Sequence, residues 1–329
     1  MTTAGSKQEK HEYLPDEQKQ ALRKAVRWQL FTIGYTICTI AVVALVMGNS
    51  QAMKTAWVED MLSLLPQLAF LVSILVVRRK PTRRHPYGWH RAVGVGHLIA
   101  GVALLAVGGM LGFEAVSGLV KVEKATIGTL DLFGHTVWLG WLAIAVMVLI
   151  IIGPLIYGPA KLKLAPKLHN KILFADADMA QADWHTNAAS IVGVLGIGLG
   201  LWWLDGAAAT FIALGIMSDG VRNAMAALAD LMDQRARTVD GKKPHPLAGE
   251  IVECARSADW VADAAVRVRD EGQVLHAEVF VKPKSDEVTL EQVGDLVDEI
   301  IEIDWKVHDV VVVPTGDLPD IADDGRRGG

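Results

Sequence analysis

Six apolar stretches of membrane-spanning length dominate the first two thirds of the chain and limit its fold most strongly. A helix needs about 20 mostly apolar residues to cross the hydrocarbon core of a bilayer. The stretches cover residues 28–48, 57–77, 92–120, 137–156, 188–204 and 206–228 of the 329-residue chain. The sequence therefore predicts a multi-span α-helical membrane protein with six transmembrane helices.

The distribution of lysine and arginine between these stretches predicts how the protein is oriented. Loops with an excess of these residues remain in the cytoplasm. The segment before the first stretch and the loops after the second, fourth and sixth are basic, whereas the other loops hold few basic residues or none. This alternation predicts a multi-pass protein of the cell membrane with both termini in the cytoplasm.

The chain after the sixth stretch has the pattern of a small soluble domain. An amphipathic helix begins near Pro246, two alternating strands follow, a capping box at Thr289 and Gln292 opens a second helix, and a last strand completes the domain. The order αββαβ predicts an α+β domain with helices on one sheet. We divide the chain into a cytoplasmic segment (1–27), a membrane domain (28–232), this cytoplasmic domain (233–316) and a disordered tail (317–329).

Composition excludes several other classes of protein. The net charge of −5 gives no indication of a nucleic-acid partner. Cys38 and Cys254 lie in different domains, which rules out a disulfide framework. His245, His276 and His308 lack the spacing of a metal motif, so a structural role is favoured for each of them over metal binding.

Acidic side chains inside the apolar stretches are the best candidates for a functional site. Ionisable residues in a membrane are costly, and they mark transport pathways or buried pairs. Glu59 and Asp60 lie in the second stretch, and Asp183 lies about 15 Å into the fifth helix if that helix begins near Leu173. Because no Lys or Arg is expected mid-span, we expect a cation, a proton or cavity water, rather than an ion pair, to compensate Asp183.

Helical spacing divides the acidic cluster that precedes the fifth stretch. Asp176, Asp183 and Asn187 share one stripe of the helix, whereas Asp178 and His185 share a neighbouring stripe. Asp176 and Asp178 come first and are predicted to face cytoplasmic water, where they would form an entrance for cations. The alternative for these two residues is solvation without a role in transport.

Together these features resemble the cation diffusion facilitator family, of which this chain would be a divergent member. The shared features are the six spans, the loop HPYGWHR, polar residues on the second and fifth spans, the LMD of residues 231–233, and the αββαβ tail. The resemblance covers about residues 25–316. It implies a homodimeric exporter that exchanges a divalent metal for protons and carries a ferredoxin-like cytoplasmic domain.

The resemblance also implies a transport site built from a pair of ligands, four residues apart, on each of the second and fifth spans. Matching SIVGVLG to the family's motif places the fifth-span pair on Asp183 and Asn187, and an alternative register keeps Asp183 as the second ligand. The matching second-span positions are Leu62 and Pro66, which offer no ligand. Asp60 is the nearest replacement, two residues outward.

Other candidate ligands depart further from the family pattern. His185 lies close to Asp183 and would join the site after a small rotation, and Glu59 is a weaker candidate. A second metal site found in the loop of some family members is matched only in part by His85 and His90, since Trp89 stands where another histidine is expected. No high-affinity metal site is expected in the tail.

The candidate ligands leave the transported metal open. The oxygen ligands of Asp60, Asp183 and Asn187 suit Mn²⁺ or Mg²⁺, whereas His185 would favour Zn²⁺, Fe²⁺ or Co²⁺. The predicted activity is secondary-active export of a divalent metal in exchange for protons by alternating access, with no enzymatic reaction and no resident cofactor. Two alternatives remain, namely a transporter of a different cation and a non-transporting membrane sensor or scaffold.

Overall fold

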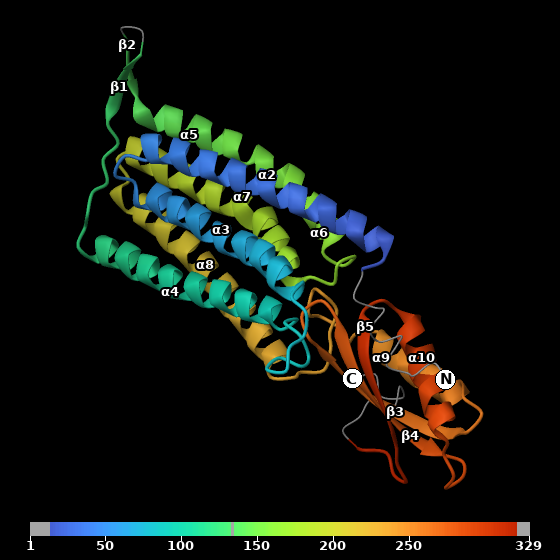
Figure 1. Ribbon diagram of the computed structural model, residues 1–329. Coiled ribbons are helices and arrows are strands. Elements are labelled where there is room, and N and C mark those ends of the chain that lie inside the picture. The colour runs from blue at the N-terminus through green and yellow to red at the C-terminus, as the bar shows by residue number, and fades with distance from the viewer. Residues whose placement is uncertain (1–13, 133–134, 321–329) are drawn as a thin grey trace.

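The structure, a computed structural model, describes residues 14–132 and 135–320. A bundle of long helices is joined at one end to a smaller α+β domain (Figure 1). The start of the first long helix lies at the same end of the bundle as this domain. Residues 1–13 of the predicted N-terminal segment and residues 321–329 of the predicted disordered tail lie outside the described residues.

Six long helical segments form the bundle. They are α2 (Asp16–Val46), α3 (Gln51–Val77), α4 (Ala92–Val120), α5 with α6 (Leu139–Ile150 and Ile152–Leu164), α7 (Lys171–Gly198) and α8 (Trp202–Leu231). Within the described part of the chain, five of the six are long and apolar enough to cross a membrane, and α7 is the exception. Its length suffices, but it carries the acidic cluster. The predicted fold class is confirmed.

The fourth segment is longer than expected and is broken near its middle. The sequence predicted a span over 137–156, whereas α5 and α6 together continue to Leu164. Pro154 has no backbone N–H to donate to the carbonyl of Ile150, four residues earlier. The hydroxyl of Tyr35 on α2 donates to that carbonyl instead, at 2.8 Å. The break at Ile151 therefore leaves the carbonyl of Ile150 with a hydrogen-bond donor. The helix continues past the break, and its basic residues Lys161 and Lys163 lie on α6.

Glycines allow α4 and α8 to pack with their backbones nearly in contact. A side-chain carbon on Gly220 would lie 2.4 Å from the backbone nitrogen of Leu105, and one on Gly101 would lie 2.6 Å from that of Ala224. Small residues give transmembrane helices this close approach. The tight pair forms one wall of the bundle, against which α3 and α7 pack.

Asp205, an acidic residue of the sixth span, has a structural role at the other end of the bundle. Its carboxylate accepts hydrogen bonds from the backbone N–H groups of Gln51 and Ala52, at 2.6 and 3.3 Å, and from the hydroxyl of Ser50. These are donors at the start of α3, which a helix leaves without partners of its own. Asp205 thus joins α8 to the N-terminus of α3. A short hairpin, β1 (Thr129–Leu132) and β2 (His135–Trp138), joins α4 to α5 and was not predicted.

The α+β domain has the predicted order of elements. It contains α9 (Leu247–Ser257), β3 (Val261–Asp270), β4 (Leu275–Pro283), α10 (Leu290–Ile303) and β5 (Val307–Pro314). In the sheet, β4 lies between β3, which is antiparallel to it, and β5, which is parallel. Both helices pack on this sheet around a buried aliphatic core. Thr289 and Gln292 form the predicted capping box.

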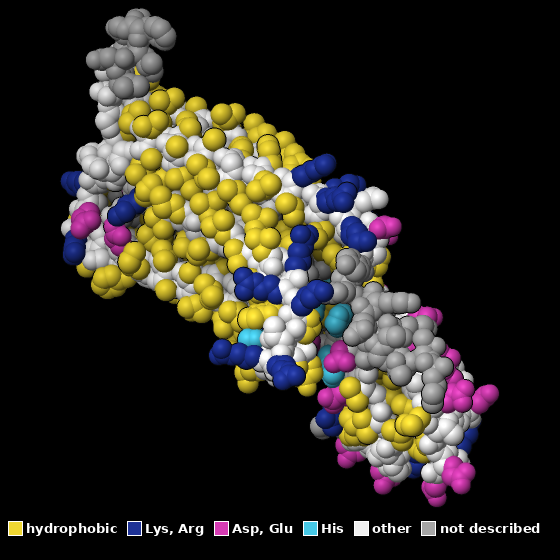
Figure 2. All heavy atoms as spheres, in the orientation of Figure 1, with side chains coloured by type: hydrophobic (Ala, Val, Ile, Leu, Met, Phe, Trp, Pro, Cys, Tyr) yellow, Lys and Arg dark blue, Asp and Glu magenta, His cyan; other side chains and the backbone are white. Residues whose placement is uncertain are grey.

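The surface of the bundle matches its proposed environment. Figure 2 shows apolar side chains along most of its length and a cluster of Lys and Arg side chains at the end that meets the α+β domain. Leu45 and Phe113, for example, are 81% and 78% exposed. Water-soluble proteins rarely expose apolar surface on this scale, so the band indicates contact with lipid.

Candidate functional site

The contact between α3 and α7 brings the two predicted halves of the transport site into one region. α3 packs along α7, and Asp60 lies within electrostatic range of Asp183. Glu59 lies within range of both of these carboxylates. All three side chains are only partly exposed. The second-span and fifth-span candidates are therefore neighbours across a helix contact.

These three carboxylates do not form a group compact enough to hold a metal ion in this conformation. Within residues 14–132 and 135–320, no three His, Cys, Asp or Glu side chains lie close enough together to hold a metal ion. A shared ion would require α3 and α7 to move slightly or their side chains to change rotamer.

Two polar side chains of α7 lie among these acids. Thr186, which the sequence reasoning did not single out, is a hydrogen-bond partner of Glu59. The other carboxylate oxygen of Glu59 is buried and has no hydrogen-bond partner in the described structure. Asn187 is buried, and its side-chain amide donates to the backbone carbonyl of Asp183 at 2.9 Å. That bond uses the nitrogen of Asn187 and leaves its side-chain oxygen as an available ligand.

His185 lies on a different side of α7. Its side chain is exposed, stacks on Trp184 with ring centroids 3.7 Å apart, and places Nδ1 3.2 Å from the carbonyl of Ala182. It would have to leave this stack to reach Asp183. In this conformation the side chains beside the acids, Thr186 and Asn187, offer oxygen atoms as metal ligands, and the imidazole of His185 lies elsewhere.

The prediction that Asp176 faces cytoplasmic water is wrong. Asp176 is 3% exposed and forms an ion pair with Lys161, which is fully buried. The side-chain amide of Gln29 on α2 donates to the same carboxylate at 3.0 Å. Lys161 was expected in the loop after the fourth span, but it lies on α6 inside the bundle, so Asp176 has a buried basic partner. The positive charge of Lys161 also lies within electrostatic range of Asp183.

Asp178 agrees with the expectation of a solvated position. Its side chain is 44% exposed and pairs with Arg222 on α8 at 3.1 Å. Arg222 also pairs with Asp219 at 2.9 Å, and Asp219 lies within electrostatic range of both Asp183 and Glu59. A path of acidic groups thus runs from the exposed side of α7 towards the α3–α7 contact.

The two histidines of the basic loop turn to different partners. His85 stacks on Trp89, with centroids 3.9 Å apart, whereas His90 lies against His308 of the α+β domain, with centroids 5.1 Å apart. Burial lowers the pKa of His90 to about 4, and the charge of His308 adds to this effect. The loop residues serve here as contacts within the loop and between domains, and the second metal site remains a prediction.

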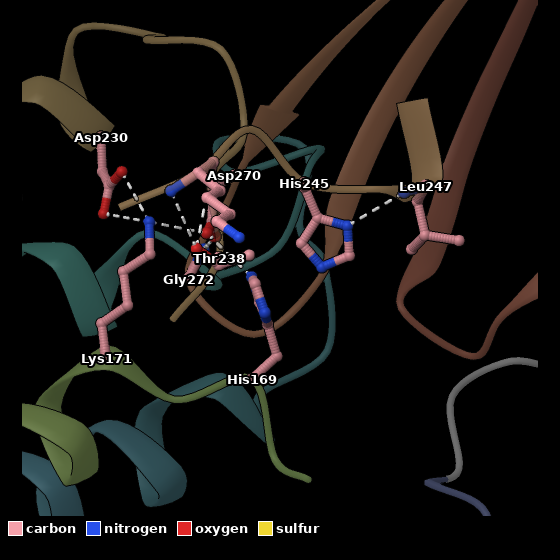
Figure 3. Close-up of polar contacts among 9 residues, drawn as sticks. His169, Lys171, Asp230, Thr238, His245, Leu247, Asp270 and Gly272 are labelled. Carbon is pink, nitrogen blue, oxygen red and sulfur yellow. Dashed lines mark hydrogen bonds and ion pairs between the residues drawn. The ribbon is translucent and has the colours of Figure 1, made fainter. Parts of the chain in front are cut away.

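A buried polar network joins α7 to the α+β domain (Figure 3). Asp270 at the end of β3 contacts His169 and Lys171, at 2.9 Å each, and Lys171 also pairs with Asp230 on α8 at 2.7 Å. Burial alone would raise the pKa of Asp270, but the hydrogen bond and charge of His169, together with Lys171, lower it to about 2. A carboxylate with that pKa stays ionised at neutral pH, so Asp270 can accept from His169 and pair with Lys171 at the same time.

This junction was not predicted from the sequence. Lys171 was expected in the loop after the fourth span, and Asp270 was expected where a strand ends in a turn. Gly272 lies two residues after Asp270, and a side-chain carbon there would lie 2.6 Å from the carbonyl of His90. The close approach of two domains at this glycine is visible only in three dimensions.

Comparison with known proteins agrees with the geometry. The sequence profile described as "Cation efflux transmembrane domain" matches residues 28–232. The "Uncharacterized transporter YdbO" of Bacillus subtilis is 26% identical over 313 residues, which cover 92% of this chain and 99% of the relative. The "Manganese efflux system protein MneS" of the same organism is 22% identical over 290 residues, covering 86% and 92%. The chain belongs to the cation efflux family, the cation diffusion facilitators that its sequence resembles.

Proposed function

We propose that this cation efflux protein exports a divalent metal from the cytoplasm in exchange for protons, and that Mn²⁺ is the preferred metal. The observation that carries the proposal is the approach of Asp60 and Glu59 on α3 to Asp183 on α7, inside an apolar bundle. No other part of the described bundle gathers acids from two helices in this way without an arginine or lysine directly paired to them.

The charges of these three acids support exchange between a metal and protons. Like charges placed together in a medium of low polarity cannot all be ionised without a countercharge. Lys161 is already paired with Asp176 and offsets Asp183 only from a distance. A divalent cation and protons are the remaining countercharges, and they compete for the same carboxylate oxygens. Binding of one therefore releases the other.

The nature of the ligands supports a hard metal. In this conformation the side chains near Asp183 offer carboxylate, amide and hydroxyl oxygens from Asp60, Glu59, Asn187 and Thr186, while His185 faces outward. Oxygen ligands suit Mn²⁺ and Mg²⁺ better than Zn²⁺. One relative carries the name of a manganese efflux protein, which agrees with this choice.

The proposed mechanism is alternating access across a membrane in which both termini face the cytoplasm. Asp178 and Asp219 form the cytoplasmic approach to the site, beside Arg222. Helix α7 then tilts against α3 so that the metal site opens to the other side, where protons displace the metal. The protein acts as a homodimer in this proposal, as the family resemblance implies.

Transport in proteoliposomes tests the proposal directly. The purified protein is reconstituted with a pH-sensitive dye inside, and Mn²⁺, Zn²⁺, Fe²⁺, Co²⁺ and Mg²⁺ are added one at a time outside. We expect the largest proton counterflow with Mn²⁺. Asp183→Asn should abolish both metal and proton flux, because the neutral amide offers no negative charge to the metal and no carboxylate to bind and release a proton.

Glu114→Gln on α4 is the matched control. Glu114 is also a carboxylate of a spanning helix, but its side chain is half exposed and pairs with Lys54, away from α7. This variant should transport at the wild-type rate. Unchanged flux in Asp183→Asn would refute the exchanger. Metal flux without proton counterflow would favour a transporter with another coupling ion, and absence of any flux in the wild type would favour a sensor or scaffold.

A further inference from the structure

A cavity of about 820 Å³ lies where the cytoplasmic ends of α2 and α3 meet the basic loop and the α+β domain. Ligand pockets in proteins have volumes of roughly 300–1,000 Å³, so this cavity is large enough for an organic ligand. It lies apart from the α3–α7 acids, and neither the proposed transport site nor the ion-pair network of Asp270 includes its walls.

One wall is a single face of α2 that is basic and apolar at once. Lys19, Leu22, Arg23, Val26 and Arg27 line the cavity and follow each other at intervals of three and four residues. Arg23 and Arg27 are exposed, whereas Leu22 is buried and Val26 is half-buried. This helix therefore presents positive charge next to apolar side chains in the same cavity.

The opposite wall repeats this combination. Ile74 and Val77 near the end of α3 are followed by Arg78, Arg79 and Lys80, all of which line the cavity. No Asp or Glu is among the described residues that line it. Within the described residues, no carboxylate pairs with the basic groups of this wall or with Arg23 and Arg27 of the first wall. Among the described residues, six basic side chains line this cavity, and of these Lys19 pairs with Asp16 at 3.2 Å.

The position of the cavity indicates which anion fits it. The apolar residues belong to helices that continue into the lipid-facing band, and the basic residues lie at the end where that band stops (Figure 2). The cytoplasmic leaflet contains anionic lipids, which attract basic segments at this depth. A soluble anion would use the arginines but would leave the partly exposed side chains of Val26 and Val77 uncovered.

We propose that this cavity binds an anionic phospholipid of the surrounding membrane. The lipid's phosphate lies between the arginines of α2 and those that follow α3, and one acyl chain lies against Val26 and Val77. The α+β domain closes the cavity with Trp305, His308 and Gln273. The lipid therefore contacts both domains and stabilises the position of one against the other.

Native mass spectrometry of the full chain in neutral detergent tests the proposal, with phosphatidylglycerol as the probe. The wild type should retain phosphatidylglycerol in preference to phosphatidylcholine. Each basic residue near an anionic membrane contributes about fivefold in affinity. Arg78→Gln with Arg79→Gln should therefore weaken retention roughly thirtyfold, and Arg23→Gln with Arg27→Gln, on the other wall, should weaken it to a similar extent.

The matched control is Arg83→Gln with Arg84→Gln. These arginines belong to the same loop and carry the same charge, but they do not line the cavity. A specific site predicts that this control retains the lipid as the wild type does. Equal loss in the control and the Arg78 and Arg79 variant would overturn the proposal in favour of diffuse attraction. Equal binding of glycerol 3-phosphate or inorganic phosphate would overturn it in favour of a soluble anion.

Discussion

Replacing Lys161 by methionine tests how much the buried ion pair between Lys161 and Asp176 contributes to the stability of the bundle. Lys161 is 0% exposed and Asp176 is 3% exposed, so the substitution leaves a carboxylate in the bundle without its countercharge. Removal of one partner from a buried pair typically costs roughly 3–5 kcal/mol. Gln29 still donates one hydrogen bond to Asp176, so we expect a cost near the lower limit, about 3 kcal/mol.

Thermal unfolding in detergent, followed by tryptophan fluorescence, measures this cost. In a domain of 150–250 residues, 1 kcal/mol shifts the melting temperature by roughly 2–4 °C, so Lys161→Met should melt roughly 6–12 °C below the wild type. Lys163→Met is the control, because Lys163 lies on the same helix but is exposed. Its melting temperature should remain within about 2 °C of the wild type.

A charge-neutral pair of substitutions separates the loss of the ion pair from the loss of packing. Lys161→Met combined with Asp176→Leu removes both charges and keeps apolar volume at both positions. Because replacing both members of a buried pair is often neutral or stabilising, the double variant should regain most of the lost stability. A double variant no more stable than Lys161→Met alone would show that the lysine contributes through packing, and the electrostatic argument would fail.

Three other predictions follow from the described contacts. Asp205→Ala removes the acceptor for two backbone N–H groups at the start of α3 and should cost about 1–2 kcal/mol, measured by the same unfolding assay. Gly220→Ala forces a carbon to within 2.4 Å of the backbone nitrogen of Leu105 and should cost about 1–3 kcal/mol, whereas Gly215→Ala, which meets open space, should be neutral. Burial, with the charges of neighbouring groups, lowers the pKa of His245 to about 4, so its contribution to stability is complete above pH 6.5 and is lost as the pH falls towards 4. The protection factor against hydrogen exchange at the start of α9, corrected for the intrinsic exchange rate at each pH, should therefore fall at pH 5 by an amount equivalent to about 1 kcal/mol, and an unchanged protection factor between pH 7 and pH 5 would contradict the role of this histidine.

Much of the fold could be predicted because its determinants are local in the sequence. The hydrophobic length of a span and the period of a strand are both local patterns, and so is a capping box such as that of Thr289 with Gln292. They indicated the helices of the bundle and the order αββαβ. The family resemblance placed the candidate ligands Asp60 and Asp183 on the second and fifth spans, and the packing of α3 on α7 brings them within electrostatic range.

The remaining features depend on contacts between distant segments. Lys161 was assigned to a loop because the apolar run before it ends, but the Tyr35 hydroxyl satisfies the carbonyl that Pro154 leaves free, and the helix continues. Asp176 then has a buried partner 15 residues earlier in the chain, which no periodicity reveals. His185 fits a ligand stripe by spacing, yet its ring stacks on Trp184 outside the bundle. The periodicity of a sequence predicts how far along a helix a residue lies, but it does not predict which residue of another helix packs against it.

The arrangement of contacts along α7 bears on how the two domains move. At its start, Lys171 pairs with Asp230 of α8 and with Asp270 of the α+β domain, and about halfway along it lies Asp183. Lys171 is 11% exposed and Asp270 is 1% exposed, so separating these groups would leave charges in a nearly dry junction at a cost of several kcal/mol. A tilt of α7 that exposes Asp183 to either side of the membrane is therefore cheapest when α8 and the α+β domain move with the start of α7. Beyond the acids, a side-chain carbon on Gly193 would lie 2.9 Å from Ala52 of α3 and one on Gly196 would lie 2.6 Å from Leu204 of α8, so these glycines let that part of α7 pack closely on both helices.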